Sequence, residues 1–197
     1  PNAHPSPALR HAQTRAGAAP TTTAPQSNAT PSGNPPRGWE ARLSGTRFLS
    51  FEHIELTGST NADLVARVHE AGDGTVLVTN FQSAGRGRLG RSWDAPPGTN
   101  LLVSALLRPD WPPERHPLVT PALAVAGVDA LAGFGVQAAL KWPNDLVIQE
   151  GPAAGKVGGI LAEYATGPPP AVVVGLGLNL AWPTAADDAP PGATSLL

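Results

Sequence analysis

The pattern of apolar and polar residues changes its period several times along the first half of the chain. Apolar, β-prone runs predict strands at residues 47–56, 75–81 and 100–107. Between the first two strands, Leu64 and Val68 lie on one face of a predicted helix. Ser59 or Thr60 can cap the start of this helix, and Gly72 ends it.

A long apolar segment and several closely spaced strands make up the second half. Residues 118–134 are apolar on most faces, which predicts a largely buried helix. The strands predicted after it are residues 137–142, 145–149, 156–165 and 171–180. Because no helices separate these strands, antiparallel pairing is favoured. We therefore expect an α+β fold with a mixed, largely antiparallel sheet and helices packed on one side, followed by a loop over 181–197.

Composition limits both the size of the folded part and its chemistry. Residues 1–38 are mainly Pro, Ala, Thr, Ser, Asn and Gly, so they cannot bury enough apolar surface and we expect a disordered tail. The remaining residues, 39–197, have the length of a single domain. The chain has no cysteine, which excludes disulfides and a cysteine nucleophile, and a formal net charge of −2 argues against a broadly basic nucleic-acid surface.

Two further features concern location and charge. No fully apolar run of about 18 residues is present and the N-terminus lacks the apolar core of a secretory signal, so we expect a cytoplasmic protein without a membrane span. Of the 13 basic residues, only Lys141 and Lys156 are lysines. Where arginine is the usual cation, a remaining lysine indicates a position that needs a compact ammonium group.

The segment FQSAGRGRLGRSW, residues 81–93, places Arg86, Arg88 and Arg91 among glycines. Like charges on a flexible backbone repel, so a bound anion would stabilise them. The glycines spell a dinucleotide-binding fingerprint, but Pro96 and Pro97 follow where that fingerprint requires a helix. The segment alone leaves an anion clamp and a solvated or nucleic-acid-binding Arg–Gly segment equally open.

The segment LKWPNDL, residues 140–146, has two interpretations. Asn144 and Asp145 after a proline are typical of a turn, which the segment by itself favours. The same side chains are also adjacent oxygen ligands at a strand end, suited to Mg²⁺ that carries nucleotide phosphates.

Two glycine-containing strands complete the candidate set. In GKVGGILAEY, residues 155–164, Gly158 and Gly159 mark either a bulge or a close approach of a ligand, with Lys156 beside it. In VVVGLGLNL, residues 172–180, the glycines before Asn179 favour close packing of a central strand, with ligand approach as the alternative. The histidines have no metal-ligand spacing.

In this order, these segments and the residues Gly58 to Asn61 resemble the catalytic domain of biotin protein ligases, over about residues 48–197. The resemblance implies the fold shared with class II aminoacyl-tRNA synthetases. It also implies an ATP-dependent ligase that joins the carboxylate of biotin to the α-phosphate of ATP, releases pyrophosphate and keeps biotinyl-5′-adenylate bound. The biotin then passes to one lysine of a biotin carboxyl carrier protein, without a covalent enzyme intermediate.

The resemblance assigns roles residue by residue. Lys156, Arg86 and Arg88 would be catalytic. Biotin would contact Ser59, Thr60, Gln82, Gly85, Arg86, Arg88, Lys156, Gly158 and Gly159. ATP would contact Arg88, Arg91, Trp93, Asn144, Asp145, Lys156 and Asn179, and Asn144 and Asp145 would meet Mg²⁺. The glycine-rich segment would become ordered over the adenylate and shield it from water.

The chain departs from the resembled family at both ends. The sequence ends at Leu197, and from it alone we expect the family's C-terminal β-domain to be absent, with a fragment of a longer chain as the alternative; residues 1–38 do not resemble the DNA-binding domain of the bifunctional members. We therefore expect a monofunctional ligase without specific nucleic-acid binding, as a monomer or homodimer. The alternatives are a lipoate ligase or lipoyl transferase, an inactive biotin or adenylate binder, and an Arg–Gly nucleic-acid-binding module.

Overall fold

The computed structural model describes residues 38–166, 169–184 and 189–197, so the predicted tail lies, except for Gly38, outside the described residues. The elements in chain order are α1 (Trp39–Leu43), β1 (Ser50–Thr57), α2 (Thr60–Ala66), β2 (Thr75–Gln82), the short 3₁₀ helix η1 (Arg88–Gly90), β3 (Asn100–Leu107), the 3₁₀ helix η2 (Pro113–Leu118), α3 (Val119–Gly133), β4 (Ala139–Lys141), β5 (Asp145–Ile148), β6 (Gly155–Ala165) and β7 (Ala171–Asn179).

Each predicted strand is present, and its ends differ from the expected ones by only a few residues. The cap of α2 is Ser59, whose hydroxyl oxygen accepts a hydrogen bond from the backbone N–H of Ala62. The helix ends at Ala66, earlier than the predicted end at Gly72, and the turn that follows occupies the difference.

The strands form one seven-stranded sheet in the order β1-β2-β3-β7-β6-β5-β4. Strands β1 and β2 are parallel, and all other neighbouring pairs are antiparallel. A parallel pair needs a crossover connection, and α2 supplies it. The mixed, largely antiparallel sheet is thereby confirmed.

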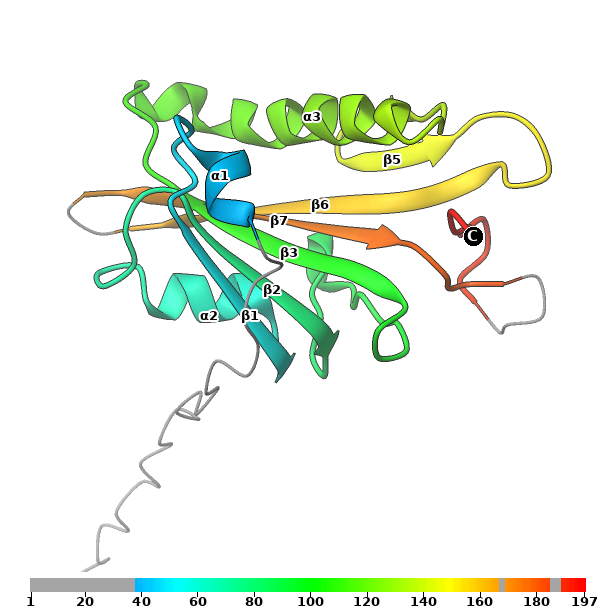
Figure 1. The fold of residues 1–197 in the computed structure, drawn as a ribbon, viewed down its shortest axis with the longest axis horizontal. Coiled ribbons are helices and arrows are strands. Elements are labelled where there is room, and N and C mark those ends of the chain that lie inside the picture. The colour runs from blue at the N-terminus through cyan, green and yellow to red at the C-terminus, as the bar shows by residue number, and fades with distance from the viewer. Residues whose placement is uncertain (1–37, 167–168, 185–188) are drawn as a thin grey trace, which may run out of the picture.

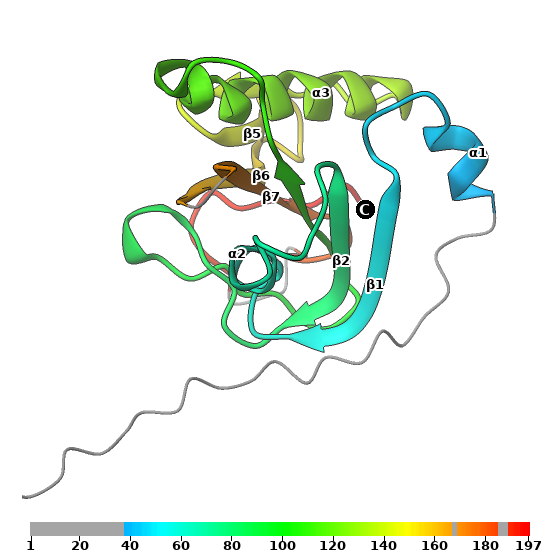
Figure 2. The same cartoon turned by 90° about the vertical axis from the view of Figure 1, so that its left-hand side faces the viewer.

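The helices lie on both faces of the sheet, so their expected placement on one side is wrong. Figures 1 and 2 show α3 above the sheet and α2 below it. Alternate residues of β7 explain the difference: Val172 and Val174 pack in a core that includes α3, whereas Val173 packs in a core that includes α2. A strand that is apolar at consecutive positions needs cover on both of its faces.

The burial of α3 also differs from expectation. Val119, Ala124 and Leu131 are buried against the sheet, but Val125 is 57% exposed. The prediction of a largely buried helix is therefore wrong. The many alanines of this helix are apolar but do not indicate which face is covered. The stretch Pro113–Gly133 spans 21 residues with a mean hydropathy of 1.2, enough by length and composition to cross a membrane. A helix that packs on a sheet meets the same criterion, so this is weak evidence for a membrane span.

Candidate active site

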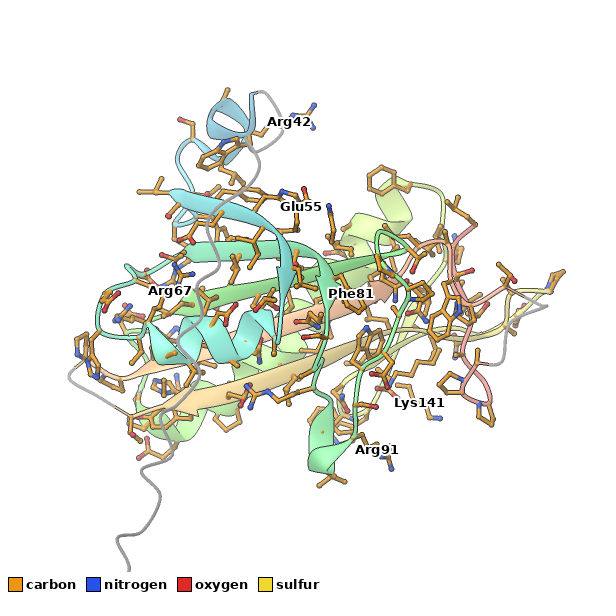
Figure 3. The ribbon with its side chains drawn as sticks, turned by 90° about the horizontal axis from the view of Figure 1, so that it is seen from below. Arg42, Glu55, Arg67, Phe81, Arg91 and Lys141 are labelled. Atoms are coloured by element: carbon orange, nitrogen blue, oxygen red, sulfur yellow. The ribbon has the colours of Figure 1, made fainter. Side chains whose placement is uncertain are left out.

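Residues 85–93, here called the Arg hairpin, fold back on themselves between β2 and β3. The Gly85 carbonyl accepts from the Trp93 N–H at 2.9 Å, and the Arg91 carbonyl accepts from the Gly87 N–H at 2.7 Å. The short helix η1 forms the tip, where Leu89 has a φ of 59°. Figure 3 shows this hairpin projecting beyond the sheet, with Arg91 near its tip. The segment therefore has a backbone structure of its own.

A cavity of about 260 Å³ lies between the Arg hairpin and the α2 face of the sheet. Its walls come from the start of α2, the end of β2, the hairpin, and strands β3, β5, β6 and β7. The predicted site residues that line it are Ser59, Thr60, Gln82, Arg86, Arg88, Arg91, Trp93, Asn144, Asp145, Lys156 and Gly159. The fold thus gathers most of the candidate side chains, from segments far apart in the sequence, around one space.

One end of the cavity carries a network of neutral polar groups. The Thr60 N–H and hydroxyl both donate to Gln82 Oε1, at 2.8 and 3.0 Å. The Thr60 and Ser104 hydroxyl oxygens lie 2.7 Å apart, and the Ser104 hydroxyl donates to Asn61 Oδ1 at 2.6 Å. Thr60, Asn61 and Ser104 are buried, so this network is shielded from bulk water and fixed in orientation.

Cationic groups also line the cavity, and the part of its wall that they form is here called the cationic end. Arg86 Nη2 lies 2.8 Å from Glu163 Oε2, and Lys156 Nζ lies 2.7 Å from Asp145 Oδ1. Arg88 Nη1 donates to Asn144 Oδ1 at 3.1 Å. Among the described residues, each of these cationic groups has one side-chain hydrogen-bond or ion-pair partner and retains other donors for an anion in the cavity.

The side chain of Asn144 makes two hydrogen bonds within the protein. Its Oδ1 accepts from Arg88, and its Nδ2 donates to the Ile160 carbonyl at 2.9 Å. Its oxygen therefore faces a cation, an arrangement that does not suit a metal ligand. The residues that the structure describes contain no cluster of three or more metal-binding side chains. Asp145 Oδ1 likewise contacts a cation, Lys156 Nζ at 2.7 Å, but the carboxylate has a second oxygen suited to metal binding.

Trp93 covers two glycines on the cavity floor. An added Cβ would lie 2.8 Å from the indole ring at Gly159 and 2.5 Å from it at Gly177, so only glycine leaves room for the ring at either position. Lys156 Nζ lies 5.5 Å from the centre of the same ring, within reach of a cation–π contact. In this structure, Gly159 and Gly177 therefore provide the space that the Trp93 ring occupies.

Gly85, Gly158 and Asn179 do not line the cavity. An added Cβ at Gly85 would lie 2.1 Å from the Trp93 carbonyl oxygen, so this glycine closes the hairpin. Gly158 borders Leu146 on the α3 face, because neighbouring residues of a strand point to opposite faces. Asn179 is buried, and its amide donates to the Thr194 carbonyl at 2.8 Å, which ties the last segment to β7.

Sequence reasoning assigned no role to Asn61, Ser104 and Glu163. Asn61 lies in the segment that carries the resemblance. Ser104 is a polar residue inside the apolar run of a predicted strand, and this interruption is the sequence signal that could have identified it as a buried functional group. Gly175 makes room for Asn61, since an added Cβ would lie 2.4 Å from Asn61 Oδ1.

Comparison with known proteins gives a consistent result. Residues 53–179 match the family described as the biotin/lipoate A/B protein ligase family. A biotin–[acetyl-CoA-carboxylase] ligase of Mycobacterium tuberculosis is 38% identical over 161 residues, which cover 78% of this chain and 57% of that protein. A protein of the same name from Paracoccus denitrificans is 37% identical over 146 residues, covering 72% of this chain and 59% of that protein.

Solved structures agree with these sequence relatives. The biotin protein ligase of Aquifex aeolicus in complex with biotin and ATP aligns with a TM-score of 0.62 and 32% identity, covering 76% of this chain and 60% of that one. The chain thus spans a little over half the length of the relatives that it matches. With its core strands, its Arg hairpin and most of its cavity inside the matched residues, the chain belongs to the biotin/lipoate A/B protein ligase family.

Proposed function

We propose that this chain carries the catalytic domain of an ATP-dependent biotin protein ligase, within residues 39–197. It would convert biotin and ATP to biotinyl-5′-adenylate and pyrophosphate. It would then transfer the biotinyl group to a lysine of a biotin carboxyl carrier protein, releasing AMP. The names of the relatives support this proposal, and one of the aligned structures is a complex with biotin and ATP.

The observation that carries the choice of biotin is the neutral polar end of the cavity. The ureido ring of biotin has N–H donors and a carbonyl acceptor, which suit the hydroxyl and amide groups of Thr60, Ser104 and Gln82. The dithiolane ring of lipoate offers no comparable partners, so buried polar groups would lose hydration without replacement. A lipoate ligase or lipoyl transferase is therefore the weaker candidate.

The cationic end of the cavity suits the activation step. The carboxylate of biotin and the α-phosphate of ATP repel each other, so positive charge must be present before the oxygen can attack phosphorus. Lys156, Arg86 and Arg88 would bind the carboxylate and α-phosphate, and Arg91 would bind the outer phosphates. The bond from the α-phosphorus to the bridging oxygen then breaks, and pyrophosphate leaves. Trp93, beside Lys156, would border the nucleotide.

Magnesium would enter with the ATP phosphates. Asp145 would supply one carboxylate oxygen, and its charge would offset that of the metal. No protein-only magnesium site is proposed, because the Asn144 oxygen is directed at Arg88.

Transfer needs no covalent enzyme intermediate. The carrier lysine, as a free amine, attacks the acyl carbon of the adenylate, and AMP leaves with the electrons of the broken acyl–oxygen bond. We propose a cytoplasmic location, where carrier proteins and ATP occur together, and a monomer or homodimer without specific DNA binding.

An Arg–Gly nucleic-acid-binding module is disfavoured by the pairing of its arginines. Arg86 and Arg88 contact Glu163 and Asn144 and line a cavity, whereas a nucleic-acid surface would present them along an open face. The remaining alternative is an inactive chain that binds biotin or its adenylate.

Biotin-dependent release of pyrophosphate from Mg·ATP tests the proposal, with lipoate in place of biotin as the specificity control. Release with biotin, none with lipoate, and loss in Lys156→Ala are the expected results. Biotin binding without release would identify an inactive binder. Absence of biotin binding would refute the proposal, and salt-sensitive RNA binding would then favour the Arg–Gly module.

A further inference from the structure

Glu163 contacts two parts of the cavity wall that are far apart in the sequence. Its Oε2 atom accepts from Arg86 Nη2 at 2.8 Å and from Asn61 Nδ2 at 2.9 Å. Arg86 belongs to the Arg hairpin and Asn61 to α2, whereas Glu163 lies on β6. One carboxylate oxygen therefore joins three segments.

The contact with Asn61 connects Glu163 to the neutral polar end of the cavity. Asn61 Nδ2 also donates to the Leu161 carbonyl at 3.1 Å, which fixes the amide plane. Asn61 Oδ1 accepts from Ser104, and the Ser104 hydroxyl lies 2.7 Å from that of Thr60. A continuous path of hydrogen bonds thus runs from the arginine of the hairpin through Glu163 and Asn61 to Ser104, one of the groups assigned to the biotin ring.

The contact with Arg86 lies beside the cavity. Arg86 lines the cavity, whereas Glu163 lines an adjoining pocket of about 870 Å³ that shares Arg86 with it. A guanidinium group has five N–H donors, and the Glu163 contact uses only one nitrogen. The carboxylate therefore holds Arg86 through one nitrogen and leaves the other guanidinium donors for a bound anion.

We propose that Glu163 is a positioning residue for the reaction, an inference that rests on the proposed function. It fixes Arg86 so that the remaining guanidinium donors face the carboxylate of the acid substrate, and it couples this arginine to the polar end. An arginine that is already fixed loses less side-chain freedom when the anion binds, so affinity for the acid rises.

The test uses Glu163→Gln, which keeps the side-chain size and removes the charge. In pyrophosphate release, the KM for biotin should rise about tenfold with a smaller change in kcat, because one immobilised side chain contributes at that scale. Glu163→Asp, which keeps the charge, should recover part of the loss. In an Arg86→Gln background, Glu163→Gln should add little, since its effect passes through Arg86.

Glu52→Gln is the matched control. Glu52 pairs with Arg67 at the same distance of 2.8 Å, and the exposed fractions of the side chains, 27% and 36%, are close to the 26% and 43% of Glu163 and Arg86. Glu52 does not line the cavity, so this variant should keep the wild-type KM. An unchanged KM in Glu163→Gln, or an equal rise in the Arg86→Gln background, would overturn the proposal.

Limited trypsin digestion of the ligand-free chain separates this inference from the proposed function. Cleavage after Arg88 and Arg91, followed by mass spectrometry, should be faster in Glu163→Gln than in the wild type or in Glu52→Gln, because the hairpin loses a tie to β6. Equal rates would overturn the inference even if the chain proves inactive. Should Glu163→Gln fail to fold, Glu163→Asp provides the same comparison, because its shorter side chain lengthens the contact to Arg86.

Discussion

Lys156 and Asp145 face each other across the pair β6 and β5, with Nζ and Oδ1 2.7 Å apart. The ammonium group is therefore held at the cavity wall before any substrate arrives. Under the proposed function, the same carboxylate would also face the magnesium-bound phosphates of ATP.

Asp145→Asn is expected to impair chemistry more than binding. The variant keeps the side-chain volume but removes the charge that fixes Lys156, so kcat for pyrophosphate release should fall about tenfold or more. Biotin affinity should change less than about threefold, because the pair is partly exposed. Stopped-flow pyrophosphate detection and calorimetry with biotin measure the two quantities. A loss confined to biotin affinity would contradict the assignment.

Gly177→Ala is expected to displace Trp93. The added Cβ would lie 2.5 Å from the indole ring, and such overpacking lowers the free energy of unfolding by about 1–3 kcal/mol. Gly133→Ala is the control, since an added Cβ there meets no atom within 4 Å. Urea unfolding compares the variants. In a Trp93→Leu background the penalty at Gly177 should shrink, and an equal penalty would disprove the steric cause.

Ser104→Ala is expected to weaken biotin binding selectively. Removal of the hydroxyl leaves Asn61 Oδ1 without its donor inside a buried network, so the biotin Kd should rise about tenfold. Thr46→Ala, at an exposed hydroxyl that donates to the Leu43 carbonyl, serves as the control. Titration calorimetry should show unchanged ATP binding in both variants. Equal weakening toward biotin and ATP would point to a general structural defect.

Two neighbouring positions test the orientation of α3. Ala124 is fully buried against the sheet and Val125 is 57% exposed. Ala124→Glu should lower the free energy of unfolding by about 3 kcal/mol or more, because it buries a charge, whereas Val125→Glu should change it by less than about 0.5 kcal/mol. Thermal and urea denaturation would show the contrast. Similar losses at both sites would mean that another surface covers the exposed face.

The sequence predicts the strands well because their apolar runs are bounded by glycine, proline and polar turns. It predicts the faces of the sheet less well, since consecutive valines in β7 are buried on opposite sides and carry the same signal. The helix α3 is misjudged for a related reason: alanine and valine occur on its exposed and buried faces alike.

The candidate site is predictable in its charged residues and less so in its glycines and its network. Arginines at close spacing and a rare lysine are visible along the chain, and the cavity contains all of them. Gly158 and Gly159 look equivalent in sequence, but strand geometry directs only Gly159 to the cavity. The role of Glu163 depends on the approach of Asn61, 102 residues earlier in the chain, which no local pattern contains.

The position of β7 has a consequence for the order of assembly during synthesis. This strand is the last that the structure describes, yet it lies in the middle of the sheet, between β3 and β6. A nascent chain that has released only β1 to β3 already carries Asn61 and Ser104, but Gly175, which makes room for Asn61, follows much later. Pairing between strands so far apart in sequence slows folding. Gly175 and Gly177 of β7 line the cavity, so the binding site is complete only after β7 has inserted between its two neighbours.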